Sequence, residues 1–174
     1  MKFDIIAISK KLKYIFILLF FAAFDDYPLV DSYHYNWIAY EYESEEYGKK
    51  CYITSSPIKS DSDHNIKRNP YIMVVKYQNN QNEEVSIYSG FEYKLNSDVK
   101  VLIDDFSYKF YTKKDMAWIR TKQEDKNIIK QMLKSKKFKV RSDSAYASYA
   151  IDHYSMKGFT RAYNRMKEIC KIDY

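Results

Sequence analysis

The feature that most constrains the fold is a strand-like rhythm between residues 34 and 120. Short runs of β-branched and aromatic residues alternate there with polar breaks, which is typical of an all-β chain. No internal repeat and no linker interrupts this rhythm, so it predicts one antiparallel unit. The expected strands cover about residues 34–42, 49–55, 71–78, 84–89, 99–103, 106–111 and 115–121.

After residue 121 the apolar spacing changes from that of a strand to that of a helix. Asp125 is the expected N-cap of a first helix, whose buried stripe begins at Ile128. Strand patterns return at residues 138–140 and 145–154. The longest break in the pattern, residues 56–70, is interpreted either as a structured binding edge or as a disordered loop.

A terminal helix is expected over about residues 156–171, with Ser155 as its cap. Its apolar residues share one face, so we expect that face to pack on the sheet while the basic residues face solvent. The basic residues, a candidate interaction surface, are Lys157, Arg161, Arg165 and Lys167. The predicted fold class is therefore mainly β: an antiparallel β-sandwich-like domain with two α-helices, one of them C-terminal.

The beginning of the chain has the pattern of a targeting segment. Residues 2–13 carry four Lys against one Asp, and an unbroken apolar run of 11 residues follows at 14–24. This order is typical of a secretory signal peptide, and the run is short for a membrane span, which needs about 20 residues. No clean cleavage motif precedes Asp25, so an uncleaved N-terminal membrane anchor and a buried core helix stay open as alternatives.

The net charge of +6 comes largely from this leader. Without residues 1–24, the remaining 25 basic and 22 acidic residues give a formal charge of +3. A nucleic-acid-binding domain usually shows a denser basic stripe, so we expect no nucleic-acid partner. A second basic cluster consists of Lys134, Lys136, Lys137, Lys139 and Arg141. Each cluster is interpreted either as a solvated face or as a surface for an anionic lipid or glycan, which would allow peripheral membrane association.

Export changes the expected chemistry of the two cysteines, Cys51 and Cys170. In an oxidising compartment they are expected to form a disulfide, which would join an early strand to the last helix. The closed loop would span about 120 residues, so the chain-entropy account gives a stabilisation of about 4–5 kcal/mol. Two buried, reduced cysteines are the alternative.

A resemblance to a known family covers nearly the whole exported part. The residues that carry it are, in order, Trp37, Cys51-Tyr52-Ile53, Pro57, Arg68-Asn69-Pro70-Tyr71, Glu84-Val85-Ser86, Gly90, Ala117-Trp118, Val140, Ser144, Asp152-His153-Tyr154-Ser155, Gly158-Phe159 and Cys170. This order resembles the invasion-associated locus B family, most specifically in the segment IDHYSMKGFTRAYNRMKEIC at 151–170. Two departures, residues 145–148 in place of a Gly-containing turn and a single cysteine pair, concern loop geometry more than the fold.

The resemblance implies an exported bacterial protein that is periplasmic, outer-membrane-associated or secreted, in a family linked to bacterial entry into host cells. It implies a β-sandwich-like domain and brings no catalytic residues. The predicted organisation is a signal peptide or N-terminal membrane anchor at residues 1–24, a short mature N-terminal segment at 25–33 and the family's domain at 34–174.

Few residues have the pattern of a catalytic or metal site. Asp152, His153 and Ser155 are the residue types of a hydrolase triad, but neighbours in a strand point to opposite faces, so Asp152 is not expected to orient His153. The histidines lack metal-ligand spacing, and the stretch from Asp61 to Asn65 lacks the Gly and the closing Glu of a calcium loop. We therefore expect no catalytic residue, no bound metal and no cofactor.

These observations favour a non-enzymatic interaction protein of the bacterial envelope or exterior. Its expected partner is a protein, a glycan or an anionic envelope or host-surface component. A periplasmic assembly or chaperone-like factor that adds a strand at an open edge is the first alternative, and an uncharacterised hydrolase is the second. Trp37 and Trp118 are expected in the core; exposed beside tyrosines, either would form a stacking platform for a sugar or peptide.

Overall fold

The structure is a computed structural model that describes residues 27–44, 48–63, 67–78, 82–146 and 148–171. Its strands are β1 (Leu29–His34), β2 (Trp37–Ser44), β3 (Gly48–Ser55), β4 (Lys59–Ser62), β5 (Tyr71–Tyr77), β6 (Glu83–Tyr88), β7 (Asp98–Ile103), β8 (Phe106–Lys113), β9 (Met116–Trp118), β10 (Lys137–Asp143) and β11 (Tyr149–Ser155). Its helices are α1 (Lys122–Met132) and α2 (Phe159–Ile169). The predicted leader at residues 1–24 lies outside the described residues. Within the described part, neither helix has the length and apolar character needed to span a bilayer.

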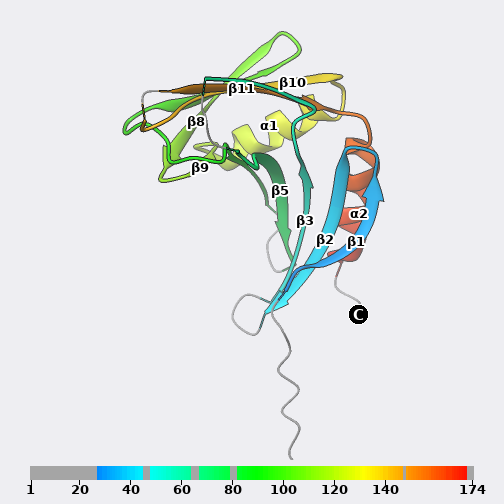
Figure 1. The fold of residues 1–174 in the computed structure, drawn as a ribbon. Helices are drawn as coiled ribbons and strands as arrows, with labels where there is room; N and C mark the ends of the chain where they lie inside the picture. Colours follow the sequence, from blue (N-terminus) through cyan, green and yellow to red (C-terminus); the bar gives the residue numbers. More distant parts are fainter. Residues whose placement is uncertain (1–26, 45–47, 64–66, 79–81, 147, 172–174) are drawn as a thin grey trace, which may run out of the picture.

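The strands of the described residues form one antiparallel sheet, in the order β1-β2-β3-β5-β6-β9-β8-β7-β10-β11-β4. The sheet bends, so that β8, β10 and β11 cross above β3 and β5 (Figure 1). We call β1, β2, β3, β5 and β6 the first half-sheet, and β8, β7, β10, β11 and β4 the second half-sheet. The short β9 joins the two. The predicted class, mainly β and antiparallel with two helices of which one is C-terminal, is confirmed, and the bend of one sheet supplies its layers.

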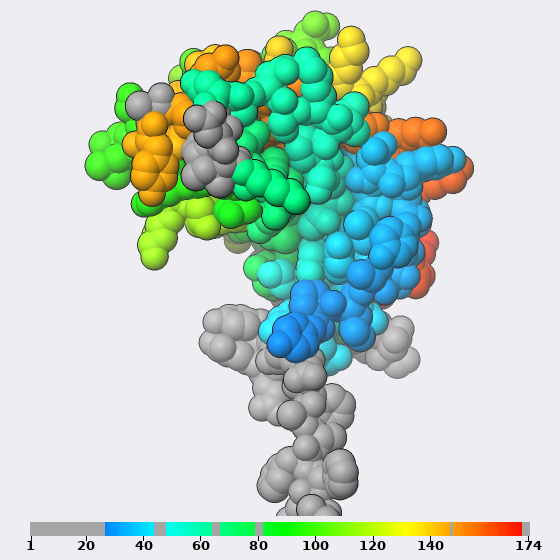
Figure 2. Space-filling view, viewed as in Figure 1, coloured from blue at the N-terminus to red at the C-terminus, as the bar shows by residue number. Residues whose placement is uncertain are grey.

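Both half-sheets turn alternate apolar residues toward one core, as expected for strands with one buried face. α2 packs on β1, β2 and β3, and α1 packs on β6. In Figure 2, β1 and β2 (blue) lie on one side and the green to orange strands on the other, with the cyan to teal β3–β4 region between them. The largest fully buried side chains are Trp37, Phe110, Phe138, Phe159, Ile53, Ile72, Ile87, Ile103, Ile128, Met132, Met166 and Val74.

Trp37 anchors α2, which confirms its predicted place in the core. Its ring meets the edge of the Phe159 ring with centroids 4.8 Å apart, and its Nε1 donates a hydrogen bond of 3.0 Å to the carbonyl of Ser155. Burying an indole is favourable here because its one polar group has a partner. Trp118 differs from the prediction: it is only half-buried and tilts against the Tyr111 ring at 5.8 Å.

The predicted cap of the first helix is wrong. α1 begins after Thr121, whose hydroxyl oxygen accepts a hydrogen bond from the backbone N–H of Glu124 at 3.2 Å, while the Glu124 carboxylate accepts one from the Thr121 hydroxyl at 2.9 Å. This reciprocal bonding resembles a capping box. Asp125 lies one residue further in and is buried; its carboxylate accepts a hydrogen bond of 2.9 Å from the backbone N–H of Val85 in β6.

The predicted cap of the terminal helix is also wrong. Ser155 ends β11, and α2 begins after Gly158, which has a φ of 97°. A Cβ at this position would lie 1.8 Å from the carbonyl oxygen of His34. Glycine is therefore required both by the backbone conformation and by the close approach of the β1–β2 turn.

Two strands were not expected. β1 begins at Leu29, inside the segment 25–33, and β4 forms within residues 56–70, where it pairs with β11 at the far edge of the second half-sheet. The chain thus crosses from the first half-sheet to the second and returns at Tyr71. The strand predicted at 145–154 also begins too early, because β11 starts at Tyr149.

Candidate functional site

The predicted disulfide between Cys51 and Cys170 is confirmed. Cys51 lies in β3 and Cys170 directly follows α2, with Cα atoms 5.6 Å apart and both residues buried. The two cysteines are 119 residues apart in the chain, so the bond fastens the last helix to the centre of the first half-sheet. Such a long closed loop removes much conformational freedom from the unfolded chain.

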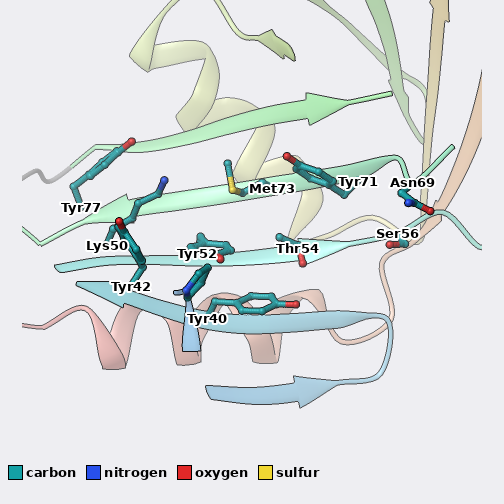
Figure 3. A pocket seen from close by; sticks show the side chains of 11 residues that line it. Tyr40, Tyr42, Lys50, Tyr52, Thr54, Ser56, Asn69, Tyr71, Met73 and Tyr77 are labelled. Carbon is teal, nitrogen blue, oxygen red and sulfur yellow. The ribbon is translucent and has the colours of Figure 1, made fainter. Parts of the chain in front are cut away.

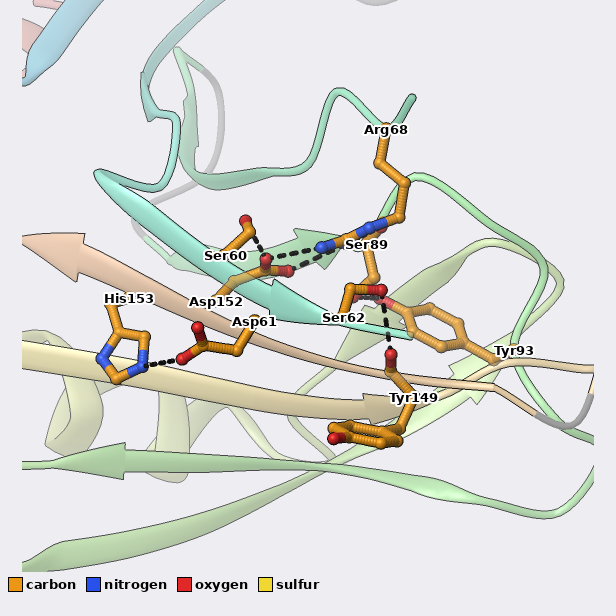
Figure 4. Close-up of polar contacts among 9 residues, drawn as sticks. All are labelled: Ser60, Asp61, Ser62, Arg68, Ser89, Tyr93, Tyr149, Asp152 and His153. Carbon is orange, nitrogen blue, oxygen red and sulfur yellow. Dashed lines mark hydrogen bonds and ion pairs between the residues drawn. The ribbon is translucent and has the colours of Figure 1, made fainter. Parts of the chain in front are cut away.

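A buried ion pair holds the second half-sheet to the connection between β4 and β5. The guanidinium of Arg68 donates hydrogen bonds of 2.8 and 3.1 Å to the carboxylate of Asp152 in β11, and the two side chains are 5% and 1% exposed (Figure 4). Arg68 also donates to the carbonyl of Ser89 at 2.6 Å, and the Ser60 hydroxyl donates to Asp152. Because the charges are paired and hydrogen-bonded, this cluster is a structural element that links four segments.

Asp152, His153 and Ser155, the three residue types of a hydrolase triad, do not contact one another through their side chains in the way that a triad requires. Asp152 points inward to Arg68, whereas His153 points to the other face, with its Nε2 3.4 Å from the Asp61 carboxylate (Figure 4). The hydroxyl oxygen of Ser155 accepts a hydrogen bond from the backbone N–H of Lys157. Among the described residues, no three His, Cys, Asp or Glu side chains gather as metal ligands would. His64 and Asn65, which belong to the histidine set and to the calcium-loop-like stretch of the sequence, lie outside the described residues.

One of the four basic residues predicted to form an interaction surface, Arg165, is bonded to another part of the same protein. Arg165 donates hydrogen bonds of 2.8 and 2.6 Å to the carboxylate of Asp31 in β1. This guanidinium lowers the pKa of Asp31 below its ordinary value. Arg165 therefore fastens α2 to the edge strand instead of presenting a free charge.

The other three basic residues of the predicted surface, Lys157 just before α2 and Arg161 and Lys167 within it, lie against aromatic rings. The Lys157 Nζ is 4.3 Å from the centre of the Tyr35 ring, and the Arg161 guanidinium is 5.8 Å from the same ring. The Lys167 Nζ is 5.4 Å from the centre of the Tyr163 ring. Lys157, Arg161 and Tyr35 are all exposed, so the surface that remains available is a small basic patch at the β1–β2 turn.

A larger feature lies on the outer face of β2, β3 and β5, opposite α2. The side chains that alternate away from the core form an open hollow of about 830 Å³, which we call the aromatic hollow (Figure 3). Aromatic rings and one lysine dominate its wall, and hydroxyl groups stand at its rim. Its residues are Pro28, Tyr40, Tyr42, Lys50, Tyr52, Thr54, Ser56, Asn69, Tyr71, Met73 and Tyr77.

The rings of the aromatic hollow brace one another. Tyr40 and Tyr52 are directly paired across β2 and β3 and stack with centroids 4.9 Å apart and planes 9° from parallel. Lys50 lies directly opposite both Tyr42 and Tyr77, and its Nζ is 5.7 Å from the centre of the Tyr77 ring. Contacts of this kind hold the side chains in place before a ligand arrives, which lowers the entropic cost of binding.

Two tyrosines of the hollow, Tyr52 and Tyr71, are held in the neutral form by burial. Burial raises the pKa of Tyr52 to about 12, with smaller contributions from the neighbouring Tyr40 and Tyr71. Burial likewise raises the pKa of Tyr71. Each ring therefore offers an apolar face together with a hydroxyl that can donate or accept a hydrogen bond.

The aromatic hollow was not among the predicted sites. The sequence signal for it is a period of two in three segments: Tyr40 and Tyr42, Lys50 and Tyr52, and Tyr71 and Met73. That pattern predicts strands equally well when it has no ligand to bind, so only the register that brings three strands together reveals the hollow.

The comparison with known families decides the identity of the domain. The profile described as "Invasion associated locus B (IalB) protein" matches residues 37–167, which is most of the chain. The chain belongs to the invasion-associated locus B family. The predicted resemblance is thereby confirmed, and the matched range contains Cys51, the Arg68–Asp152 pair and Gly158. No curated protein and no solved structure matches the chain.

Proposed function

We propose that this protein is an exported component of the bacterial envelope or exterior that binds a partner and transforms no substrate. Membership of the invasion-associated locus B family and the Cys51–Cys170 disulfide both support export, because such bonds persist in oxidising compartments. The basic and apolar pattern of residues 1–24 supports a signal peptide or membrane anchor.

The observation that carries the binding role is the aromatic hollow. Five half-buried tyrosines line one open hollow, and rings that are already held in place can stack on a ligand at little entropic cost. The rings present flat apolar faces to the ligand, and their hydroxyls, with Thr54 and Asn69, surround them with hydrogen-bonding groups. A glycan chain fits this chemistry, since its rings carry apolar C–H faces and a hydroxyl periphery.

The proposed mechanism is capture by stacking. Sugar rings would lie on Tyr40, Tyr52 and Tyr71, while Lys50 would attract a carboxylate or phosphate substituent of the glycan. The family name associates its members with invasion, so a host-surface or envelope glycan is the proposed source of the ligand.

Titration of envelope and host-cell glycans by calorimetry or on an array tests this proposal. We expect Tyr52→Ala and Tyr71→Ala each to weaken binding at least tenfold, at about 1.4 kcal/mol per tenfold. Tyr146→Ala is the matched control, because Tyr146 is 72% exposed and lies outside the hollow. Equal affinity of all three variants and the wild type would contradict the proposed site.

A second candidate function is strand addition by an assembly or chaperone-like factor, and the edge strand β1 is the observation that favours it. Among the described strands, β1 has a single neighbour, β2, and it exposes Leu29 and Tyr33 to 64% and 72%. However, its pairing with β2 is irregular between Val30 and Ser32, which makes the edge a poorer template for a further strand. Recovery of outer-membrane proteins of the producing cell in a pull-down, abolished by Tyr33→Pro, would support this function over glycan capture.

A further inference from the structure

The outer face of the second half-sheet carries a different set of side chains from the aromatic hollow. The strand register places Lys109, Lys100 and Arg141 directly beside one another on β8, β7 and β10. The next row on the same face places Lys139 of β10 between Leu102 and His153. We call the surface around five of its exposed cations the basic face; they are Lys100, Lys109, Lys137, Lys139 and Arg141. Lys59 of β4, opposite His153, lies on the same face but is paired with Asp61 at 3.0 Å.

This arrangement costs the fold stability. Like charges at directly paired positions of neighbouring strands repel one another. Arg141 has a partial counter-charge in Asp143 at 3.5 Å and lies over the Tyr149 ring at 5.1 Å. For Lys100, Lys109 and Lys139, no described carboxylate lies within salt-bridge distance. A sheet that keeps unneutralised like charges side by side is best explained by a partner that supplies the missing negative charge.

Apolar side chains lie among these cations. A hollow of about 480 Å³ opens on this face, where Leu102 and Ile58, exposed to 37% and 63%, meet the lysines. His153 also lines it, already paired with Asp61 at 3.4 Å. The acidic group lining the hollow is Asp104, whose carboxylate accepts a hydrogen bond from the backbone N–H of Lys137. The hollow therefore combines an apolar interior with a predominantly cationic rim.

We infer that the basic face docks on an anionic lipid surface. Lys100, Lys109, Lys139 and Arg141 would meet the phosphates of several headgroups, and the hollow at Leu102 would receive the upper part of one lipid. A sulfated glycan would use the cations but gain nothing from exposed Leu102 and Ile58, so the mixed chemistry favours a lipid. The inference rests on the proposed export, which brings the domain next to a membrane, but it uses a surface separate from the aromatic hollow.

Vesicle binding of the protein as recovered from the producing cell tests this inference. We expect sedimentation with vesicles of equal phosphatidylglycerol and phosphatidylcholine, and much weaker sedimentation with phosphatidylcholine alone. The double variant Lys100→Glu/Lys139→Glu should bind the anionic vesicles at least tenfold more weakly, since each surface lysine contributes about 1 kcal/mol. Binding of the wild type should also weaken as salt rises.

The matched control is Lys122→Glu/Lys126→Glu on the exposed side of α1, which changes the net charge by the same amount. This control should bind within twofold of the wild type. An equal loss in both double variants would overturn the inference, because the effect would then follow net charge alone. Retention on heparin that depends on Lys100 and Lys139, without anionic vesicle binding, would overturn it in favour of a sulfated glycan.

Thermal unfolding adds a readout that does not depend on lipid. Lys100→Glu places an acid between Lys109 and Arg141, so its melting temperature should equal or exceed that of the wild type. A lower melting temperature would contradict the claimed repulsion. Glycan binding at the aromatic hollow should be unchanged in this variant, so failure of the lipid inference and failure of the proposed function are separate results.

Discussion

The two half-sheets share a core, but they differ in the interaction that fastens each of them and in the side chains on their outer faces. The first is fastened by a covalent bond from Cys51 to the end of α2, and its outer face is aromatic with Lys50 in its hollow. The second is fastened by the buried Arg68–Asp152 pair, and its outer face is rich in lysine and arginine. The comparison shows that one sheet can carry two surfaces of different chemistry, because its inner face alone is committed to the core.

The disulfide should have the largest effect on stability. Cys51→Ser/Cys170→Ser should lower the free energy of unfolding by about 5 kcal/mol, since the wild-type bond closes a loop of about 120 residues. Guanidinium unfolding monitored by fluorescence measures the change. If α2 is held to the first half-sheet mainly by this bond, hydrogen exchange should quicken in α2 before it does in β10. An unchanged unfolding midpoint would show that the bond does not fasten this half.

The buried ion pair should have the next largest effect, and it should act on the other half. Asp152→Ala leaves the guanidinium of Arg68 buried without its counter-charge, which should cost about 3–5 kcal/mol. Replacing both partners, as in Arg68→Met/Asp152→Leu, should cost less than Asp152→Ala, because no charge is stranded. A double variant less stable than Asp152→Ala would contradict this account of the pair.

Asp125, at the junction of α1 and β6, should make stability depend on pH. Burial raises the pKa of Asp125 to about 6, with Glu84 and Glu124 adding to the rise. A raised carboxyl pKa favours the fold below the unfolded value, near pH 4, and this contribution is lost as pH rises through about 6.

Asp125→Asn tests that dependence, since its amide oxygen can still accept the hydrogen bond from Val85. The variant should be more stable than the wild type by about 2–3 kcal/mol at pH 7, and the difference should shrink toward pH 4. Urea unfolding at pH 4, 5.5 and 7 measures it. Parallel stability curves for the two proteins would show that Asp125 does not titrate in this range.

The smallest effect on stability is expected among the basic residues in and just before α2. Arg165→Ala should lower the melting temperature, because Arg165 donates two hydrogen bonds to Asp31, whereas Arg161→Ala should leave the melting temperature nearly unchanged. Conversely, charge reversal at Lys157 and Arg161 should weaken any anionic partner of this face in a salt-dependent way. Thermal melts and binding at two ionic strengths distinguish the two roles; equal destabilisation by Arg161→Ala would contradict the division.

Much of the strand pattern can be predicted from the sequence, and the failures at β4 and Trp118 have physical causes. β5 and β7 have the alternation of β-branched residues that marks a half-buried strand. β4 has the sequence KSDS and is exposed throughout, so its sequence has no alternation of apolar and polar residues that would predict a strand. It is a strand because its backbone pairs with the free edge of β11. Trp118 shows the reverse case, since an aromatic residue in a strand pattern can face outward as readily as inward.

The helix caps show the same limit at the scale of one residue. Thr121, with Glu124 three positions later, had the spacing of a capping box, but Asp125 stood closer to the apolar stripe. The role of Asp125 depends on Val85, which is 40 residues away in the chain. Gly158 is likewise explained only by the carbonyl of His34 that lies against it.

The sequence by itself determined the family, the mainly β class, the two helices and the pairing of Cys51 with Cys170. These follow from local periodicity, motif order and the presence of two cysteines, which can be read along the chain. Only the tertiary structure decided that Arg68 pairs with Asp152, that Arg165 pairs with Asp31, and that tyrosines and lysines lie on separate faces of the sheet. Those outcomes depend on strand register and on the bend of the sheet, which arise from contacts between distant segments.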